Sequence, residues 1–303
     1  MGASAPTLAP SDVASAESTL RHLELRVLRK LDGLLHGDHL GLVPAAGTEA
    51  GAGRLYVPGD DVRRIDWNLT ARSGVPHVRD TVADRELETW LVVDGSASLD
   101  FGTARFEKRD LALAAAAAFG FLTSRSGNRF GAVIFDGDGE AIVPPRAGRE
   151  AMLGFLRRLE RRPRSAPGRA SLASGLRTAR LVARRRGLVV VVSDFLDADG
   201  WVRELRSLGA HHDVVVCRVA DPREFELPPV GLLTFVDPES GRRVEVQTAR
   251  RDVRERFAAA AQRQCDDTRA AVRSARAAYL ELSTDRDWML DVIRFVSLRR
   301  RMR

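Results

Sequence analysis

The chain has 303 residues, of which 44% are hydrophobic and 29% are charged, so it is long enough and apolar enough to bury a substantial core. Its formal net charge of +7 is carried almost wholly by arginine, because Lys30 and Lys108 are the only lysines. This charge permits a nucleic-acid, acidic-lipid or acidic-protein partner without demonstrating one. Cys217 and Cys265 form no metal-binding or disulfide spacing, which excludes a disulfide-dense secreted scaffold and favours a reducing compartment.

The N-terminal residues and the apolar runs bear on where the protein resides. Residues 1–20 lack the basic start and the apolar core of a secretory signal peptide. The longest apolar run, at 111–122, is too short to span a bilayer and fits a buried helix. We therefore expect a cytoplasmic protein without a membrane span.

Residues 1–85 are predicted to form an N-terminal helix and a signature segment that pack on the core of the molecule. The apolar face of residues 13–35 predicts a helix that ends at Gly37. A loop of small residues follows at 44–53, and then a dense segment of charged and large apolar residues at 54–72. A short strand is expected at 77–81.

Residues 86–303 are predicted to form one α/β domain. Strands are expected at 90–93, 129–135, 141–143, 187–194, 213–219, 230–236, 243–247 and 279–282. Helices are expected at 105–122, 150–159, 171–184, 201–207, 252–273 and 288–298. This alternation predicts a doubly wound, mostly parallel sheet flanked by helices, with one hairpin leading to an edge strand near 141 and another hairpin on the sheet edge at 230–247.

Oxygen-bearing side chains follow two of the most apolar strands. Asp94, Ser96 and Ser98 come at alternate positions after the first of these strands, and Asp194 ends the second. Ser171 lies where a loop enters a helix. Hard oxygen donors without cysteine or histidine suit Mg²⁺, Mn²⁺ or Ca²⁺, and weak hydroxyl ligands would leave positions open to an external carboxylate. The alternative interpretation is that Asp94 and Ser96 only cap the following loop and helix.

The spacing of these residues resembles the metal-ion-dependent adhesion site of von Willebrand factor A-type domains. That site has the order Asp-x-Ser-x-Ser, then a threonine, then an aspartate. Asp94, Ser96 and Ser98 match the first element, and Asp194 matches the last acid. Ser171 stands where the family usually has threonine, which keeps a hydroxyl at that position. The resemblance implies a von Willebrand A-like fold and a divalent ion.

The segment at 54–72 alternates charged residues with large apolar ones. One interpretation is a buttress held by Asp–Arg pairs against the main domain. The other is a recognition surface. The residues that would contact a partner on such a surface are Asp61, Arg63, Asp66, Trp67 and Arg72.

The same segment is the most specific family signal in the chain. It contains Tyr56-x-Pro58-Gly59-Asp60-Asp61-Val62-Arg63-x-Ile65-Asp66-Trp67, followed by Thr70-Ala71-Arg72. This pattern resembles the signature of the domain-of-unknown-function family 58, in which it precedes a von Willebrand A-like domain. The resemblance covers about residues 30–300. It implies an AAA+ ATPase of the MoxR type as a partner and a role in maturing or assembling other proteins.

The favoured function is a metal-dependent protein-binding module. An ion held by the five oxygen donors would accept an acidic residue from the ATPase or from a client protein. The alternative is a metal-assisted hydrolase that uses the same carboxylates. Against it, the sequence offers no nucleophile–base pair and no phosphate-binding loop, so no catalytic residue is predicted. A nucleic-acid binder ranks last, because only the net charge supports it.

Overall fold

The structure is a computed structural model, and it describes residues 54–57, 62, 65–78, 88–124, 128–164, 170–197 and 200–301. The helix predicted at 13–35 and the loop at 44–53 lie outside these residues. The α/β domain begins with the strand at residue 88 and continues to residue 301, with short gaps.

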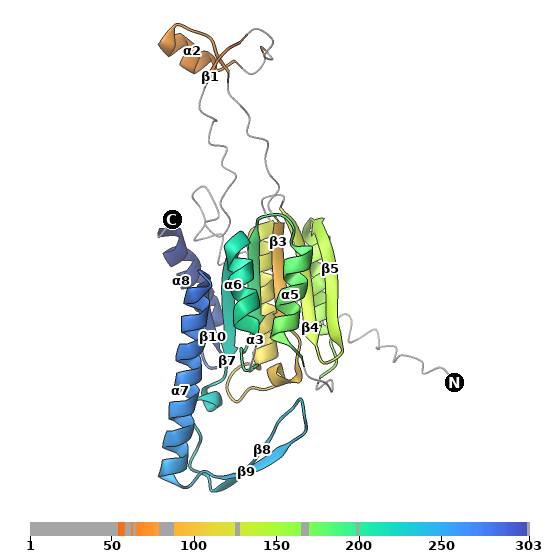
Figure 1. The fold of residues 1–303 in the computed structure, drawn as a ribbon, viewed down its shortest axis with the longest axis vertical. Helices are drawn as coiled ribbons and strands as arrows, with labels where there is room; N and C mark the ends of the chain where they lie inside the picture. Colours follow the sequence, from red (N-terminus) through yellow and green to blue (C-terminus); the bar gives the residue numbers. More distant parts are fainter. Residues whose placement is uncertain are drawn as a thin grey trace, which may run out of the picture.

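A six-stranded sheet forms the centre of this domain (Figure 1). Its strands in chain order are β3 (Glu88–Asp94), β4 (Arg129–Asp136), β5 (Gly139–Ala147), β6 (Leu188–Ser193), β7 (Asp213–Ala220) and β10 (Ala278–Ser283). Their order in space is β10-β7-β6-β3-β4-β5, and all neighbours are parallel except β5, which pairs antiparallel with β4 at one edge. The doubly wound, mostly parallel sheet with an edge hairpin is therefore confirmed.

Helices cover both faces of the sheet, and each face has its own hydrophobic cluster. One face carries α3 (Lys108–Ser124), α4 (Arg149–Glu160) and α8 (Trp288–Arg301), and the other carries α5 (Leu172–Val182), α6 (Trp201–His211) and α7 (Arg251–Ser274). Successive residues of a strand point to opposite faces, so Leu91 packs in the first cluster and Val92 in the second. Strands β3 and β6 are buried at every position, as their unbroken apolar runs predict.

The strand order places a switch point between β3 and β6. From β3 the chain proceeds to β4 and β5 on one side, and from β6 it proceeds to β7 and β10 on the other. Near the carboxyl ends of the two strands, Val93 pairs with Val192. In open α/β sheets, ligands bind in the crevice outside the carboxyl ends of the strands at such a point. The residues that follow these ends are therefore the first place to look for a site.

The hairpin predicted at 230–247 exists, but its predicted place was wrong. Strands β8 (Leu232–Val236) and β9 (Arg243–Gln247) pair with each other in a separate two-stranded sheet and do not extend the main one. Figure 1 shows the hairpin beyond the end of the sheet at which β3 leads into α3. The alternation that predicts a hairpin carries no information about which sheet edge, if any, it joins.

A small unit precedes the α/β domain. It consists of β1 (Arg54–Leu55), α2 (Trp67–Ser73) and β2 (His77–Val78), with β1 and β2 paired antiparallel. Figure 1 shows this unit apart from the main sheet. The hydrogen bonds from the Tyr56 amide to the Pro76 carbonyl and from the Asp66 amide to the His77 carbonyl, each 2.8 Å, close it internally. Its packing on the core of the α/β domain stays a prediction.

Candidate functional site

Asp94 is the last residue of β3, and its carboxylate is 4% exposed. Two groups donate hydrogen bonds to it: the Ser96 amide to Oδ1 at 2.7 Å and the Ser193 hydroxyl to Oδ2 at 2.6 Å. Among the described residues, no ammonium or guanidinium group forms an ion pair with Asp94. The Arg162 guanidinium, which donates to the Ser96 carbonyl at 3.4 Å, attracts the Asp94 charge from a longer distance.

Asp194 follows β6 directly and is 3% exposed. Its Oδ2 accepts hydrogen bonds from the Ser98 hydroxyl and from the Lys108 ammonium, each at 2.8 Å. The Ser96 and Ser98 hydroxyls lie 2.7 Å apart. The two strand ends are therefore joined by one network that contains four of the five predicted oxygen donors.

The backbone after Asp194 bends sharply. Phe195 has a φ of 58°, in the left-handed region that few residues other than glycine adopt, and its ring is buried. This conformation brings the Leu196 amide to 3.1 Å from Asp194 Oδ1. Backbone strain of this kind persists where the surrounding packing determines it and is typical of functional sites.

Lys108 is a member of this site that the sequence analysis missed. It is the first residue of α3, it is 1% exposed, and its ammonium also lies 2.5 Å from Glu224 Oε1. Burial opposes the charged form, but the carboxylates of Asp194 and Glu224 outweigh it and raise the pKa of Lys108. One signal was present in the sequence. The chain is rich in arginine, and position 108 is one of only two that carry lysine, whose ammonium is more compact than a guanidinium.

The two buried aspartates have opposite pKa shifts. Burial, and then the charge of Asp194, raise the pKa of Asp94 to about 6, although its hydrogen bonds act in the other direction. Burial also opposes ionisation of Asp194, but the Lys108 ammonium prevails and holds the pKa of Asp194 below its usual value. The site thus contains one carboxylate that is paired with a lysine at 2.8 Å and one that forms no ion pair among the described residues.

Ser171 is placed differently from the other four donors. It is half-buried, and its hydroxyl caps α5 by accepting a hydrogen bond of 3.3 Å from the Ser174 amide. The next amide, that of Leu172, donates to Asp197 Oδ2 at 3.0 Å, which joins the start of α5 to the loop that follows Asp194. The structure therefore brings this helix end to the same loop, and the role of Ser171 as a fifth ligand stays a prediction.

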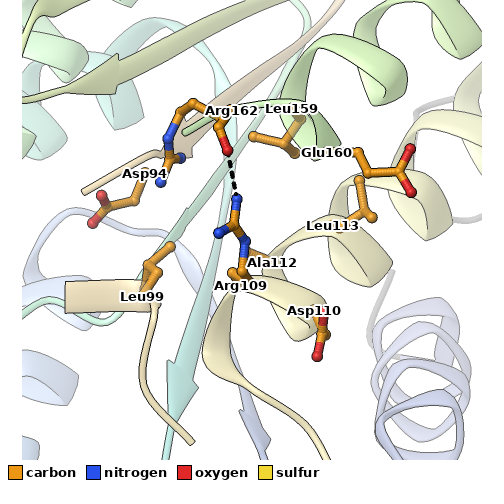
Figure 2. A pocket seen from close by; sticks show the side chains of 9 residues that line it. All are labelled: Asp94, Leu99, Arg109, Asp110, Ala112, Leu113, Leu159, Glu160 and Arg162. Carbon is orange, nitrogen blue, oxygen red and sulfur yellow. Dashed lines mark hydrogen bonds between the residues drawn. The ribbon is translucent and has the colours of Figure 1, made fainter. Parts of the chain in front are cut away.

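A pocket of about 120 Å³ opens beside Asp94 (Figure 2). Its lining comes from the loop after β3, from α3 and from the end of α4: Asp94, Leu99, Arg109, Asp110, Ala112, Leu113, Leu159, Glu160 and Arg162. Arg109 donates to the Arg162 carbonyl at 3.0 Å, the bond drawn in Figure 2. The Arg162 guanidinium lies so close to Gly95 that a Cβ there would be 2.4 Å from Nη1. The same Cβ would also lie 2.9 Å from the Phe135 carbonyl oxygen, and because that atom belongs to the backbone of a strand, a side chain at 95 would force the strand or the loop to shift.

The predicted partner-binding residues are only partly described. Asp61 and Arg63 lie outside the described residues. Asp66 caps α2 by accepting hydrogen bonds from the amides of Asn68 and Leu69 at 3.0 and 3.1 Å. Arg72 is exposed in the last turn of this helix, and the Trp67 side chain is 71% exposed.

Among the described residues, no group of three or more histidine, cysteine, aspartate and glutamate side chains could hold a metal ion. The network at the switch point is a different donor set, because two of its four side chains, Ser96 and Ser98, are serines. All of its donors are hard oxygens, which match Mg²⁺ and Ca²⁺ in chemistry. Within the described part of the chain, the helices also lack the combination of length and apolar character that crossing a membrane requires.

Comparison with solved structures gives resemblances at low sequence identity. An aerotolerance-related membrane protein from Bacteroides fragilis matches with a TM-score of 0.48 and 13% identity, covering 72% of this chain and 100% of that one. A von Willebrand factor type A protein from Catenulispora acidiphila matches with a TM-score of 0.41 and 11% identity, covering 74% of this chain and 43% of that one.

Sequence comparison gives much higher similarity. The uncharacterized protein Rv1480 of Mycobacterium tuberculosis and the uncharacterized protein Mb1516 of Mycobacterium bovis are each 52% identical to this chain over 287 residues, which is 94% of this chain and 90% of each relative. The model of the family described as "Protein of unknown function DUF58" matches residues 52–267. Since this match spans most of the chain, the protein belongs to the DUF58 family.

Proposed function

We propose that this protein is a protein-interaction module whose crevice at the switch point binds a divalent cation, Mg²⁺ in the first instance, and through it a carboxylate of a partner protein. The observation that carries the proposal is the buried network in which Asp94, Ser96, Ser98 and Asp194 converge from two strand ends. A hard cation bound there would supply positive charge directly to the Asp94 carboxylate, which forms no ion pair with any described residue.

The residues present fit such an ion by their chemistry. Asp94 is buried beside a second carboxylate, and burial together with the charge of Asp194 raises the pKa of Asp94 to about 6. Asp94, Ser96 and Ser98 would hold the ion, with Asp194 and Ser171 at its margin. Because Lys108 already pairs with Asp194, the ion would be attracted chiefly by the Asp94 carboxylate.

Hydroxyl ligands bring no charge, so an ion held this way would remain electrophilic. A carboxylate from outside would then complete its coordination, and recognition would depend on both the metal and an acidic residue. We propose a MoxR-type AAA+ ATPase, or a client protein, as the source of that residue. The exposed Trp67 supports a second contact through the signature segment, because large exposed aromatic side chains are common anchors at interfaces.

The described residues give less support to a hydrolase. The described histidines that could act as a base lie elsewhere: His211 and His212 precede β7, at the opposite end of the sheet from the crevice, and His77 belongs to the small N-terminal unit. Cys217 is fully buried, and burial raises the pKa of its thiol. A binding function therefore fits the site better than catalysis.

Calorimetric titration with Mg²⁺ tests the ion. Wild-type protein should release or take up heat with a saturable isotherm, and Asp94→Asn should not. Asp136→Asn is the matched control, because Asp136 also ends a strand of the sheet but belongs to no bond of the network. Identical isotherms for wild type and Asp94→Asn would contradict the ion site.

Binding to a co-expressed MoxR-type ATPase, measured with Mg²⁺ and with EDTA, tests the partner. We expect capture of the ATPase in Mg²⁺ that is lost in EDTA and in Asp94→Asn. If the ATPase is captured equally well in EDTA, the partner does not bind through a metal ion in the crevice.

A further inference from the structure

A second pocket lies at the opposite end of the sheet from the crevice. Helices α5 and α6 pack side by side on one face of the sheet (Figure 1), and each ends shortly before the strand that follows it, β6 or β7. Since β6 and β7 are parallel, both helix ends meet the starts of these strands at the same edge. The pocket there has a volume of about 560 Å³, which is within the range of small-molecule binding sites.

The charged side chains that line this pocket are all basic. The polar lining comes from the end of α5, the loop at 183–187 and the end of α6, and it consists of Arg180, Arg184, Arg186, Ser207, His211 and His212. No aspartate or glutamate is among the described residues that line the pocket. The pocket therefore attracts anions.

Neighbouring carboxylates balance only part of this charge. Arg180 Nε lies 3.4 Å from Glu204 Oε2 on α6. Arg184 and Arg186 form no ion pair with any described residue, and both are exposed. Two of the three guanidinium groups in the lining are therefore without a carboxylate partner in the described part of the chain.

The two helix ends do not balance the remainder. The carboxyl end of a helix carries about half a unit of negative charge, and basic side chains there are stabilising for that reason. Together α5 and α6 supply about one such unit, and Glu204 supplies another. Three guanidinium groups exceed this sum, so the pocket keeps a surplus of positive charge.

His212 supplies an independent observation. It is half-buried in the wall of the pocket, and its Nδ1 is buried without a hydrogen-bond partner among the described residues. Burial lowers the pKa of His212, and the charges of His211 and Arg186 lower it further, although the Ala183 backbone acts in the other direction. A buried polar atom without a partner is destabilising. An anion in the pocket would offset the positive charge around His212 and offer a partner to this nitrogen.

We infer that this pocket binds a small molecule through two or more linked phosphate groups. A guanidinium group matches phosphate because it donates two parallel hydrogen bonds to it, and the pocket accommodates more than a single phosphate. No aromatic side chain is among the described lining residues, so a nucleotide base would find no surface on which to stack. The ligand is therefore recognised by its phosphates. This site goes beyond the proposed function, because it shares no residue with the crevice.

Calorimetric titration of the full chain with tripolyphosphate, in metal-free buffer at physiological ionic strength, tests the inference. Wild-type protein should show a saturable isotherm, and Arg184→Gln and Arg186→Gln should each lower the affinity about tenfold. Arg185→Gln is the matched control, since Arg185 belongs to the same loop but does not line the pocket and lies 3.9 Å from Glu88 Oε1. This control removes the same charge and should leave the affinity unchanged. The free energy of unfolding in urea checks that all three variants fold as wild type does.

ATP carries the same number of phosphates as tripolyphosphate and should bind with about the same affinity. If ATP binds more than about tenfold more tightly, the site recognises the nucleoside as well, and the assignment to phosphates alone is wrong. If the three variants lose affinity equally, the anion responds to the net charge of the chain and not to the pocket, and the inference is wrong. Absence of tripolyphosphate binding to wild type would also overturn it.

Discussion

The ends of β3 and β6 lie side by side at the switch point, yet the aspartates at these two ends have opposite pKa shifts. Asp194 is paired with the Lys108 ammonium at 2.8 Å, and its pKa is held low. Asp94 receives hydrogen bonds from Ser96 and Ser193 but forms no ion pair among the described residues, and its pKa is raised to about 6. Both are nearly completely buried, so the difference comes from the neighbouring charge and not from burial.

The comparison indicates a division of roles between the two strand ends. Lys108 supplies a permanent cation, which allows the crevice to fold without any bound ion. Asp94 forms no ion pair among the described residues, so its carboxylate is available to an external cation. If this interpretation is right, changes at the two ends should differ in size, in pH dependence and in their response to Mg²⁺.

The largest effect is expected from Lys108→Met. Removal of one partner from a buried ion pair leaves an uncompensated charge, so we expect a loss of about 3–5 kcal/mol in the free energy of unfolding at pH 7.5. Urea denaturation in EDTA measures this loss. In an Asp194→Asn background the same change should cost clearly less, since one of the two unpaired carboxylates is then absent.

The same denaturation experiment repeated with Mg²⁺ gives a second test. It should restore more stability to Lys108→Met than it adds to wild type, because the ion then has two unneutralised carboxylates to bind. A loss below about 1 kcal/mol for the single variant would show that Lys108 does not hold the Asp194 end together.

The sequence predicted the strand ends well because apolar runs identify buried parallel strands, and the chemistry follows directly after them. The pattern Asp94-x-Ser96-x-Ser98 and the aspartate at 194 were sufficient to place most of the network. The predicted strand boundaries were also close: 129–135 was expected, and the strand is Arg129–Asp136.

The partners of these aspartates could not be predicted in the same way. Lys108 is 86 residues from Asp194 and 116 residues from Glu224, and no local pattern marks either pairing. The placement of the β8–β9 hairpin was missed for a related reason. The sequence predicts a turn at 237–241 but gives no direction for the hairpin that carries it, because strand pairing specifies register and not placement.

A smaller effect, with a distinct pH dependence, is expected from Asp94→Asn in EDTA. A carboxyl whose pKa is raised on folding stabilises the folded state below its unfolded pKa of about 4, and that stability is lost as the pH rises through about 6. Asparagine does not ionise, so the variant does not share this loss. Its free energy of unfolding should rise relative to that of wild type by about 1–3 kcal/mol between pH 4 and pH 7.5. Chemical denaturation at several pH values measures this difference.

Asp136→Asn, at the end of β4, provides the control for the pH profile, because it changes a carboxylate at a strand end without entering the network. A stability difference between wild type and Asp94→Asn that is constant from pH 4 to pH 7.5 would mean that Asp94 is neutralised after all, and the contrast between the two strand ends would disappear.

The smallest effect concerns the hydroxyl that connects the two ends. Ser98→Ala removes one hydrogen bond to Asp194 and one to Ser96, and because Ser98 is only half-buried the cost should be about 1 kcal/mol. Ser171→Ala should cost a similar amount for a different reason, since it removes the cap of α5. Stability alone therefore cannot distinguish the two serines, whereas Mg²⁺ affinity can. If Mg²⁺ affinity falls in Ser98→Ala but not in Ser171→Ala, the ion is held by the network between the strand ends alone. If Mg²⁺ affinity falls in both variants, the hydroxyl at the start of α5 also coordinates the ion.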